Sequence, residues 1–342
     1  MNVPRFSVVL PVRNGGAHLR ECVASILGQT LADGFELLVL DNASTDGTTA
    51  WLGSLRDPRV RLHPADRPLS IEQNWARIRG LPRGELMTLI GHDDLLDADF
   101  LATMDALVRA HPDAGLFSAH FRLIGDTGAF QRHCRPMPAR ETAAEFLALR
   151  LLDLRDTFGT GYVMRSTDYD RVGGIPPYAK LLHADDALWM SLMEGSWKAT
   201  SPRELFSYRL HGGSASGARD PGAYLAALEC YQDALESLAA RDPAVHEVLA
   251  RYGPAAYFQT GEYLHKGFLL TALAAGSKYP PGTAPRLRRV QTRFAGAGGV
   301  SLRRKRRLRW LESLHGWPGG RWVFRGVRAL ASLFGQGRRF VD

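Results

Sequence analysis

Two pairs of neighbouring aspartates are the residues of this chain best suited to chemistry. Asp93 and Asp94 directly follow an apolar run, and Asp185 and Asp186 begin an amphipathic segment much further along. Adjacent carboxylates at the rim of a sheet repel each other, and a divalent cation that carries a phosphate ligand relieves this repulsion. A carboxylate placed elsewhere in the same site can take a proton from a hydroxyl group. The alternative for both pairs is that they cap helix N-termini.

The segments around the first pair predict an open α/β sheet. Residues 86–90 have the pattern of a buried parallel strand, and residues 98–110 have that of a helix. Two earlier buried strands, over 6–12 and 34–40, end in polar loops and enclose a helical pattern, which predicts parallel pairing. Ligands of such sheets bind at the carboxyl ends of the strands. The loops that follow these strands are therefore predicted to meet at one site.

The loop 41–48 has the composition of a nucleotide-binding turn. Asp41 is placed to accept a hydrogen bond from a base, and Ser44 helps to close the turn. A capping box that begins at Ser70 opens a helix whose polar face carries Asn74. We expect this face to lie over the same rim of the sheet.

The middle of the chain contains further predicted strands, and three candidate site residues, Gly159, Gly161 and His211, lie next to them. Strands are predicted at 59–63, 114–121 and 205–211, and a further strand follows the two glycines of 158–164; a loop is predicted at 125–138 and a helix at 147–156. Gly159 and Gly161 fall where backbone approaches another group, either in a bulge or beside a ligand. His211 ends the last strand and is either bonded to backbone or a metal ligand.

The composition indicates a globular protein. The chain has 342 residues, 45% of them apolar and 23% charged, which suffices for one α/β domain and an extension. No apolar leader precedes the first strand and no run is long enough to cross a bilayer, so we expect a cytoplasmic protein. Cys22, Cys134 and Cys230 are odd in number and far apart, which predicts reduced thiols rather than disulfides or a zinc site.

Basic charge is concentrated at the C-terminal end. Residues 286–342 hold fifteen Lys and Arg against two acids. The basic run 303–310 precedes aromatic and aliphatic residues up to position 334, a composition typical of a helix lying on the anionic inner face of the cell membrane. Basic patches also attract nucleic acid, but no nucleic-acid-binding motif accompanies this one, so we expect no such partner. The alternative is a pair of helices packed on the domain.

Helical spacing of apolar residues continues from 221 to 275, and 279–282 is the best linker candidate. The predicted organisation is an α/β domain over 1–216, a helical extension over 217–278 and a basic amphipathic tail over 279–342. The extension can pack within the chain or form a dimer interface, so the sequence leaves the oligomeric state open.

Taken together, these motifs resemble family 2 glycosyltransferases of the GT-A fold. The resemblance rests on residues 9–14, 41–48, 91–94, 185–186 and 208–211, which follow the family's order. It implies an α/β, Rossmann-like GT-A fold for 1–216, with a mixed, mostly parallel sheet flanked by helices. It also implies inverting transfer of a sugar from a nucleotide-diphosphate sugar, UDP-sugar in particular, to a hydroxyl of a glycan or lipid-linked saccharide in cell-surface polysaccharide biosynthesis.

The resemblance assigns the nucleotide diphosphate to the first part of this domain. Asp41 matches the aspartate that recognises the uracil of UDP donors. Asp93 and Asp94 match the acids of the family's metal motif, and His211 matches its late metal-binding histidine, with Mg²⁺ or Mn²⁺ as the cofactor. The residues expected to contact the nucleotide are Pro11, Val12, Asn14, Asp41, Ser44, Asn74, His92 and Asp93.

Catalysis is assigned to the second acid pair. Asp186 matches the family's general base, Asp185 stands beside it as the other catalytic acid, and Gly159 and Gly161 are expected to line the donor sugar. Inversion in one displacement needs a single carboxylate on the face opposite the leaving group. A cation at the diphosphate offsets the negative charge that the leaving group gains.

Three positions depart from the family pattern. Gly91 stands where the first acid of the metal motif falls, Asn42 where many members have a second aspartate, and Asp185 where the family has glutamate. A non-catalytic sugar-nucleotide-binding or scaffold protein on the same fold is therefore the alternative function. A nucleotidyltransferase is disfavoured, because residues 11–14 stand where such enzymes carry a glycine-rich loop with a basic residue.

Overall fold

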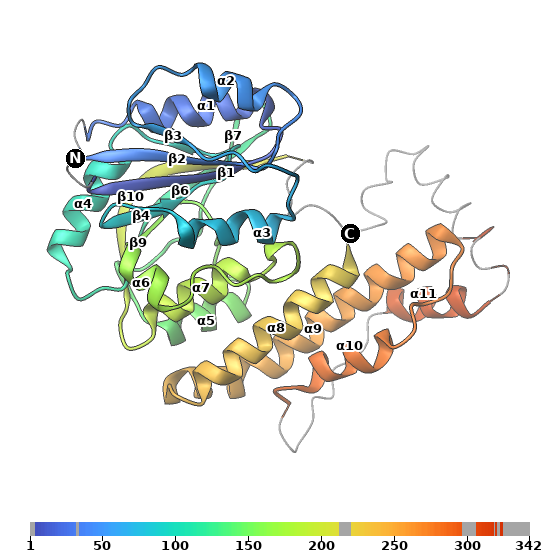
Figure 1. Ribbon diagram of the computed structural model, residues 1–342. Helices are drawn as coiled ribbons and strands as arrows, with labels where there is room; N and C mark the ends of the chain where they lie inside the picture. Colours follow the sequence, from blue (N-terminus) through green and yellow to red (C-terminus); the bar gives the residue numbers. More distant parts are fainter. Residues whose placement is uncertain are drawn as a thin grey trace. The chain divides into compact units, whose positions relative to one another are not determined.

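The computed structural model describes residues 4–31, 34–211, 220–295, 306–317, 319 and 322–323. The chain divides into two units. The first unit comprises Met1–Ala218 with Asp233–His246, and the second comprises Arg219–Gln232 with Glu247–Asp342. The first unit contains the sheet, whereas the second is helical (Figure 1). Residues 233–246, which the sequence places in the helical extension, group with the first unit.

The strands and helices have the following bounds. The strands are β1 (Phe6–Val12), β2 (Phe35–Asp41), β3 (Val60–Leu62), β4 (Leu86–Leu89), β5 (Leu95–Leu96), β6 (Leu116–Gly125), β7 (Phe130–His133), β8 (Arg140–Glu141), β9 (Tyr162–Arg165) and β10 (Lys198–Leu210). The helices are α1 (Gly16–Leu27), α2 (Thr48–Ser54), α3 (Ile71–Ala76), α4 (Phe100–Ala110), α5 (Ala143–Leu151), α6 (Ser166–Arg171), α7 (Ala184–Met193), α8 (Pro221–Ala239), α9 (Pro243–Ala275), α10 (Thr283–Thr292) and α11 (Arg306–Gly316). Short 3₁₀ turns are η1 (Arg77–Gly80) and η2 (Ala179–Leu181).

A mixed sheet forms the framework of the first unit. Within the described ranges the strand order is β3-β2-β1-β4-β9-β6-β10-β5, with β7 beside β6 and β8 beside β10. β1 pairs in parallel with β2 and β4, and β6 pairs in parallel with β10. β9 is antiparallel to both β4 and β6. The prediction of a mixed, mostly parallel sheet flanked by helices is confirmed.

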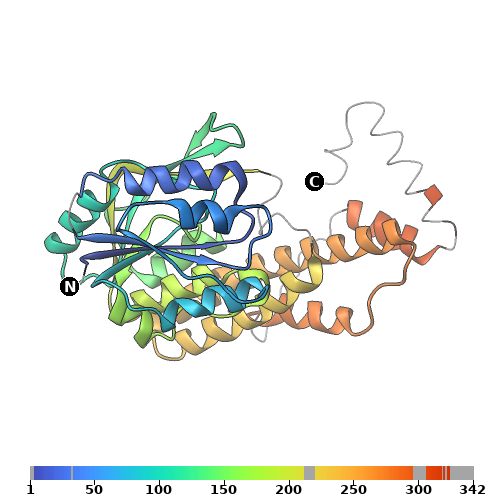
Figure 2. The same cartoon turned by 45° about the horizontal axis from the view of Figure 1, so that its top comes forward.

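Helices cover both faces of this sheet, which explains the apolar runs of its central strands. Every residue of β1 and β2 is buried. α1 and α2 lie on one face, and α3, α5, α6 and α7 lie on the other (Figures 1 and 2). The apolar side of α1 packs on β1 and β2 in the main core and includes Cys22, as predicted. Cys22, Cys134 and Cys230 are free thiols, and only Cys230 of the three is exposed.

The sheet places three loops side by side. Val12 of β1 pairs with Asp41 of β2, and the Ile90 N–H donates to the Val9 carbonyl at 3.1 Å. The carboxyl ends of β1, β2 and β4 therefore lie together, as expected for adjacent parallel strands. The predicted motifs after these strands share one edge of the sheet.

Two elements differ from the sequence-based expectation. The pattern predicts a helix over 147–156, but α5 begins earlier because Thr142 and Glu145 form a capping box in front of it. Residues 152–161 are a loop instead. β7 lies within the predicted loop 125–138 and pairs antiparallel with β6. Its four residues are all exposed, so the hydrophobic pattern that marks a strand is missing.

The second unit consists of helices in its described part. α9 runs without interruption through Pro254, whereas the sequence predicts two helical segments there. On α11, Leu308, Leu311 and Leu314 form a buried cluster with Leu269 and Leu273 of α9. No helix in the described ranges is long and apolar enough to span a membrane.

The cluster between α9 and α11 corrects part of the prediction for the basic tail. The sequence predicts that the apolar residues after 303 face a membrane, but the leucines of α11 are packed inside the second unit. Trp317 and Trp322 are exposed. Residues 303–305 and 324–334 of the predicted membrane helix, like the glycine-rich stretch 212–216, lie outside the described residues.

Gly161 provides a test of packing against the sheet. Its φ is +86°, and a Cβ placed there would lie 2.1 Å from the Phe206 ring. We expect Gly161→Ala to lower the free energy of unfolding by about 3 kcal/mol or more, because strain and overlap add. Gly173 has a φ of +89° but no atom within 4 Å of the same position, so Gly173→Ala should cost only about 1–2 kcal/mol. Urea denaturation measures both, and equal losses would contradict the packing explanation.

Candidate active site

A pocket of about 620 Å³ opens at the carboxyl ends of β1 and β4. It is lined by residues from segments 11–13, 69–75, 91–94, 157–160 and 180–185, together with Asn42, Ile175 and Tyr208. The fold thus brings both predicted acid motifs to one cavity, although about ninety positions separate them in the sequence. Pockets with a few converging polar groups are the usual location of active sites.

Asp93 and His211 contact each other at this pocket. The Nε2 atom of His211 lies 2.6 Å from Oδ2 of Asp93, and each side chain is about 15% exposed. His92 also lines the pocket, and burial lowers its pKa, which leaves the imidazole neutral at pH 7. Asp93 lines the pocket, whereas His211 does not line it and contacts the Asp93 carboxylate.

Asp94 is held away from this pair by two hydrogen bonds. Its Oδ2 accepts a 2.5 Å hydrogen bond from the Thr160 hydroxyl, and its Oδ1 accepts the N–H of Arg209 at 2.9 Å. The side chain is buried, and burial together with the charge of Asp93 raises the pKa of Asp94 to about 8. In the described part of the chain, no three His, Cys, Asp or Glu side chains converge on a metal position. Two of the three predicted metal ligands are in contact, and Asp94 is engaged elsewhere.

The space around Asp93 and Asp94 requires a glycine at position 91. A Cβ on Gly91 would lie 2.7 Å from Asp93 Oδ1 and 3.0 Å from Asp94 Oδ2. The acid that the family motif has at this position would therefore displace both carboxylates. Thr160 completes the turn, because its hydroxyl also accepts the Gly91 N–H at 2.9 Å.

Asp41 does not line the pocket. It is fully buried, and its two carboxylate oxygens accept hydrogen bonds from the hydroxyls of Ser44 and Thr49 at 2.5 and 2.6 Å. Asn14 and Ser44 also lie outside the lining, where the Asn14 N–H donates to Ser44 Oγ at 2.9 Å and the Thr45 N–H donates to Asn14 Oδ1. These polar groups join the loops after β1 and β2.

Pro11, Val12, Asn42 and Asn74 do line the pocket. The Asn42 amide exchanges two hydrogen bonds with the backbone of Leu69, at 2.9 and 2.7 Å. Asn74 donates to the carbonyl of Leu40 and accepts from the guanidinium of Arg77. Their side-chain hydrogen bonds hold the walls of the pocket in place.

The second acid pair is divided between the pocket and the interior. Asp185 lines the pocket, whereas Asp186 is buried and receives two hydrogen bonds from Arg150 on its Oδ2. Burial and the charge of Asp186 raise the pKa of Asp185 to about 7. Burial would raise the pKa of Asp186 as well, but Arg150 and His183 together outweigh it and lower that pKa. The geometry favours Asp185 as the group that faces a substrate, and the role of Asp186 as general base stays a prediction.

A strained segment precedes this pair. Lys180, Leu181 and His183 have φ values of 57°, 55° and 60°, in the left-handed region that L-residues avoid, and all three line the pocket. The N–H of Lys180 donates to Glu72 Oε1 at 2.6 Å. Backbone strain of this kind is typical of binding sites. The sequence contains no glycine or motif here that would have indicated the segment.

Aromatic rings form one wall. Phe158 and Tyr208 stack with centroids 3.5 Å apart, and both line the pocket together with Trp75. Gly159 lies in this wall, whereas Gly161 does not line the pocket and packs under Phe206. Flat apolar surfaces of this type suit the face of a sugar ring or a base.

Residues 7–169 match the family model described as glycosyl transferase family 2. This match covers just under half of the chain and identifies the family that the chain resembles. The matched segment contains Asp41, Asp93 and Asp94 and ends before Asp185 and His211. The family resemblance stated from the motifs is thereby confirmed.

Curated relatives are similar to this chain over part of their length. A PGL/p-HBAD biosynthesis glycosyltransferase of Mycobacterium bovis (strain BCG / Pasteur 1173P2) is 33% identical over 121 residues, which cover 34% of this chain and 46% of the relative. Two further relatives are covered over 20% and 40% of their length. The chain thus spans less than half of these relatives.

Solved glycosyltransferases share the fold at low sequence identity. S. aureus TarS 1-349, in complex with UDP-GlcNAc, has a TM-score of 0.61 at 15% identity, with 88% of this chain and 97% of that chain covered. Mannosyltransferase PcManGT from Pyrobaculum calidifontis, in complex with GDP-Man and Mn²⁺, has a TM-score of 0.52 at 19% identity, covering 94% and 87%. The predicted GT-A fold is confirmed.

The buried Asp94 carboxyl has a consequence for stability. It titrates near 8 in the folded chain but near 3.9 when unfolded, so the folded state holds the extra proton between these values. Its contribution to stability therefore falls as the pH rises from about 4 to 8. We expect Asp94→Asn to raise the free energy of unfolding at pH 8 by at least about 1 kcal/mol in the presence of EDTA.

Denaturant titrations from pH 5 to 8 measure this difference, and it should shrink toward pH 5. The control is Asp153→Asn, because that side chain is 92% exposed and should show no change. A difference that is the same at every pH would show that the Asp94 carboxyl does not titrate in this window.

Proposed function

We propose that this protein is an inverting glycosyltransferase. It transfers a sugar from a nucleotide-diphosphate sugar, UDP-sugar in particular, to a hydroxyl of a glycan or lipid-linked saccharide. The observation that carries the proposal is a single pocket lined by Asp93, beside His211, and by Asp185. The match of residues 7–169 to the glycosyl transferase family 2 model supports the reaction class. The complexes of TarS with UDP-GlcNAc and of PcManGT with GDP-Man support the donor class.

In this proposal Asp185 is the general base. The acceptor oxygen forms a bond to the anomeric carbon as the bond from that carbon to the diphosphate oxygen breaks. The electron pair of the broken bond leaves with the nucleoside diphosphate, and the acceptor proton passes to the Asp185 carboxylate. A base with a pKa of about 7 is about half ionised at neutral pH and strong enough to take that proton.

The pair of Asp93 and His211 fits a divalent cation such as Mg²⁺ or Mn²⁺. Asp93 lines the pocket, an imidazole nitrogen of His211 lies 2.6 Å from its carboxylate oxygen, and neither side chain is fully buried. Magnesium sites in nucleotide enzymes use one or two protein carboxylates and complete their coordination with phosphate oxygens. When bound, the cation would neutralise charge on the departing diphosphate.

A donor screen tests the proposal. UDP-, GDP- and dTDP-sugars are incubated with the protein and Mn²⁺ or Mg²⁺, and the release of nucleoside diphosphate is measured. We expect slow hydrolysis of one donor that EDTA abolishes. Asp185→Asn should lower the rate by about 10²–10⁴-fold, because the base is lost, while the affinity for the nucleotide is retained. His211→Ala should raise the metal concentration needed for half-maximal rate.

The outcomes separate the proposal from its alternative. Donor binding in calorimetry without turnover, even with lipid-linked acceptors, would favour the non-catalytic nucleotide-sugar-binding protein. Full activity of Asp185→Asn together with an inactive Asp186→Asn would assign the base to Asp186. A rate that is unaffected by EDTA would remove the metal from the proposal.

The proposal includes an acceptor at the surface of an anionic membrane, in line with the basic C-terminal end. Arg288 and Arg289 on α10 are exposed, as are Trp317 and Trp322. Cationic and indole side chains together favour the interface of an anionic bilayer. The leucines of α11 are packed within the second unit, so the proposed contact uses the exposed cationic and indole side chains.

Vesicle sedimentation tests the membrane part separately. We expect the full chain to bind vesicles that contain phosphatidylserine and to dissociate when the salt concentration is raised. Vesicles of phosphatidylcholine alone are the control and should retain little protein. Equal binding to both, or binding to neither, would contradict an electrostatic membrane contact.

A further inference from the structure

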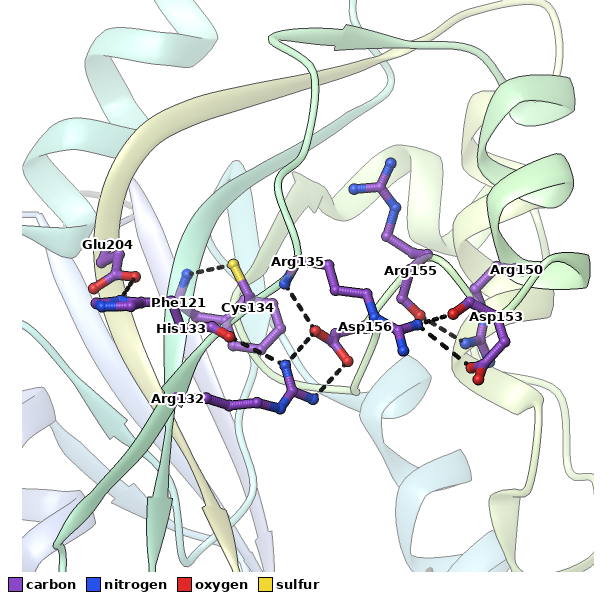
Figure 3. A network of polar contacts seen from close by, with 10 residues as sticks. All are labelled: Phe121, Arg132, His133, Cys134, Arg135, Arg150, Asp153, Arg155, Asp156 and Glu204. Atoms are coloured by element: carbon purple, nitrogen blue, oxygen red, sulfur yellow. Dashed lines mark hydrogen bonds and ion pairs between the residues drawn. The ribbon is translucent and has the colours of Figure 1, made fainter.

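Arg150, which does not line the pocket, donates hydrogen bonds both to Asp186 and to the loop that follows α5. Arg150 lies at the end of α5, and its Nε and Nη2 atoms donate to Asp186 Oδ2 at 3.0 and 2.7 Å. Its Nη1 atom donates to the backbone carbonyl of Arg155 at 3.1 Å (Figure 3). A planar guanidinium can serve both partners at once, which a lysine ammonium cannot do with the same geometry.

The Arg155 carbonyl belongs to the loop that becomes the pocket wall. The loop, residues 152–161, joins α5 to β9, and its residues 157–160 line the pocket. Thr160 at its end donates to Asp94. Arg150 therefore acts on the segment that also holds the first acid pair.

This loop is fixed on its other side by the β6–β7 hairpin. Arg132 donates two 2.8 Å hydrogen bonds to the Asp156 carboxylate, and the N–H of Arg135 donates a third (Figure 3). The guanidinium of Arg155 is buried and paired with Glu141, which also pairs with Lys198. These contacts fix the loop where Nη1 of Arg150 donates to it.

Asp186 depends on two neighbouring cationic or hydrogen-bonding side chains, Arg150 and His183, for its charge. The carboxylate is 2% exposed, and the structure gives its Oδ1 atom no hydrogen-bond partner. Arg150 donates two hydrogen bonds to Oδ2, at 3.0 and 2.7 Å, and is the nearer of the two, since His183 Nδ1 lies 4.0 Å from that atom. A buried carboxylate that loses its cation is costly, and it moves toward other hydrogen-bond donors. This movement would disturb Asp185, whose Oδ1 accepts the Asp186 N–H at 2.9 Å.

We propose that Arg150 is a positioning residue that holds Asp186 against the pocket loop and so fixes Asp185 toward the acceptor. The inference rests on the proposed function, in which Asp185 is the base. Arg150 and Asp186 do not line the pocket and need not touch the donor or the acceptor. Their effect is on the orientation and the proton affinity of Asp185.

The charges around Asp185 decide how its titration responds. Asp186 and His183 belong to α7 and the residue before it, Arg150 comes from α5, and Lys180 lines the same pocket. The negative charge of Asp186 raises the pKa of Asp185, and the positive charge of Arg150 lowers it. Removing one of these two charges should therefore shift the acid limb of the kcat profile in a direction that depends on which one is removed.

The test compares pH profiles of kcat for donor hydrolysis in the full-length protein. In Arg150→Gln we expect kcat to fall at least about tenfold at pH 7 and the acid limb to move up by on the order of one pH unit, because a stabilising cation is lost. In Asp186→Asn the acid limb should move down, because a neighbouring anion is lost. Arg150→Lys keeps the charge and should restore the position of the limb but only part of kcat.

Two controls keep the result interpretable. Arg59 pairs with Asp57 through its Nε and Nη2 atoms, as Arg150 does with Asp186, so Arg59→Gln removes a matched ion pair that lies outside the pocket lining. It should leave the profile unchanged. If Arg150→Gln does not fold, the double variant Arg150→Leu with Asp186→Leu replaces the buried pair by apolar side chains, a change that folds well in other proteins. It should bind UDP with normal affinity and show a low kcat.

Three results would overturn the inference or the function beneath it. If the acid limb of the kcat profile stays at the same pH in both Arg150→Gln and Asp186→Asn while Asp185→Asn is inactive, Asp185 remains the base and the role of Arg150 is rejected. A parallel loss of UDP affinity and kcat in folded Arg150→Gln would show a general structural role instead. Full activity of Asp185→Asn would reject the proposed base itself.

Discussion

The burial of the Asp94 carboxylate is the constraint on which the site depends. Its two hydrogen bonds join the turn after β4 to the pocket loop through Thr160 and to β10 through the Arg209 N–H. The same arrangement brings His211, two residues further along the chain, against Asp93. A carboxylate in such surroundings is expensive to keep ionised, and three separate segments are held in register by the groups that satisfy it.

Much of the framework could be predicted from the sequence, because its central strands are buried on both faces. Apolar runs at 6–12 and 34–40 and helical spacing at 98–110 correspond to β1, β2 and α4 within two residues. The exceptions have physical reasons. All four residues of β7 are exposed, so no alternation of buried and exposed side chains marks it. Proline normally breaks a helix, so the sequence predicts an interruption at Pro254 that α9 does not have.

The candidate site could be predicted only as far as the backbone determines it. Parallel strands end together, so the motifs after β1, β2 and β4 had to share one edge. The partners of each side chain come from distant segments and leave no local signal. Asp41 has both oxygens occupied by Ser44 and Thr49, and Asp186 meets an arginine 36 positions earlier in the chain. Such pairs decide which acid of a motif faces the substrate.

Two of the three cysteines are buried, so a thiol-reactive label can be directed to the third, Cys230. Desolvation raises the pKa of Cys22 and of Cys134, so their thiolates are scarce as well as shielded. Cys230 on α8 is exposed. Thiolate-selective reagents therefore discriminate strongly in its favour. A fluorophore or spin label can be coupled to the second unit of the unaltered chain, and spectroscopy of substrate binding needs no cysteine-free background.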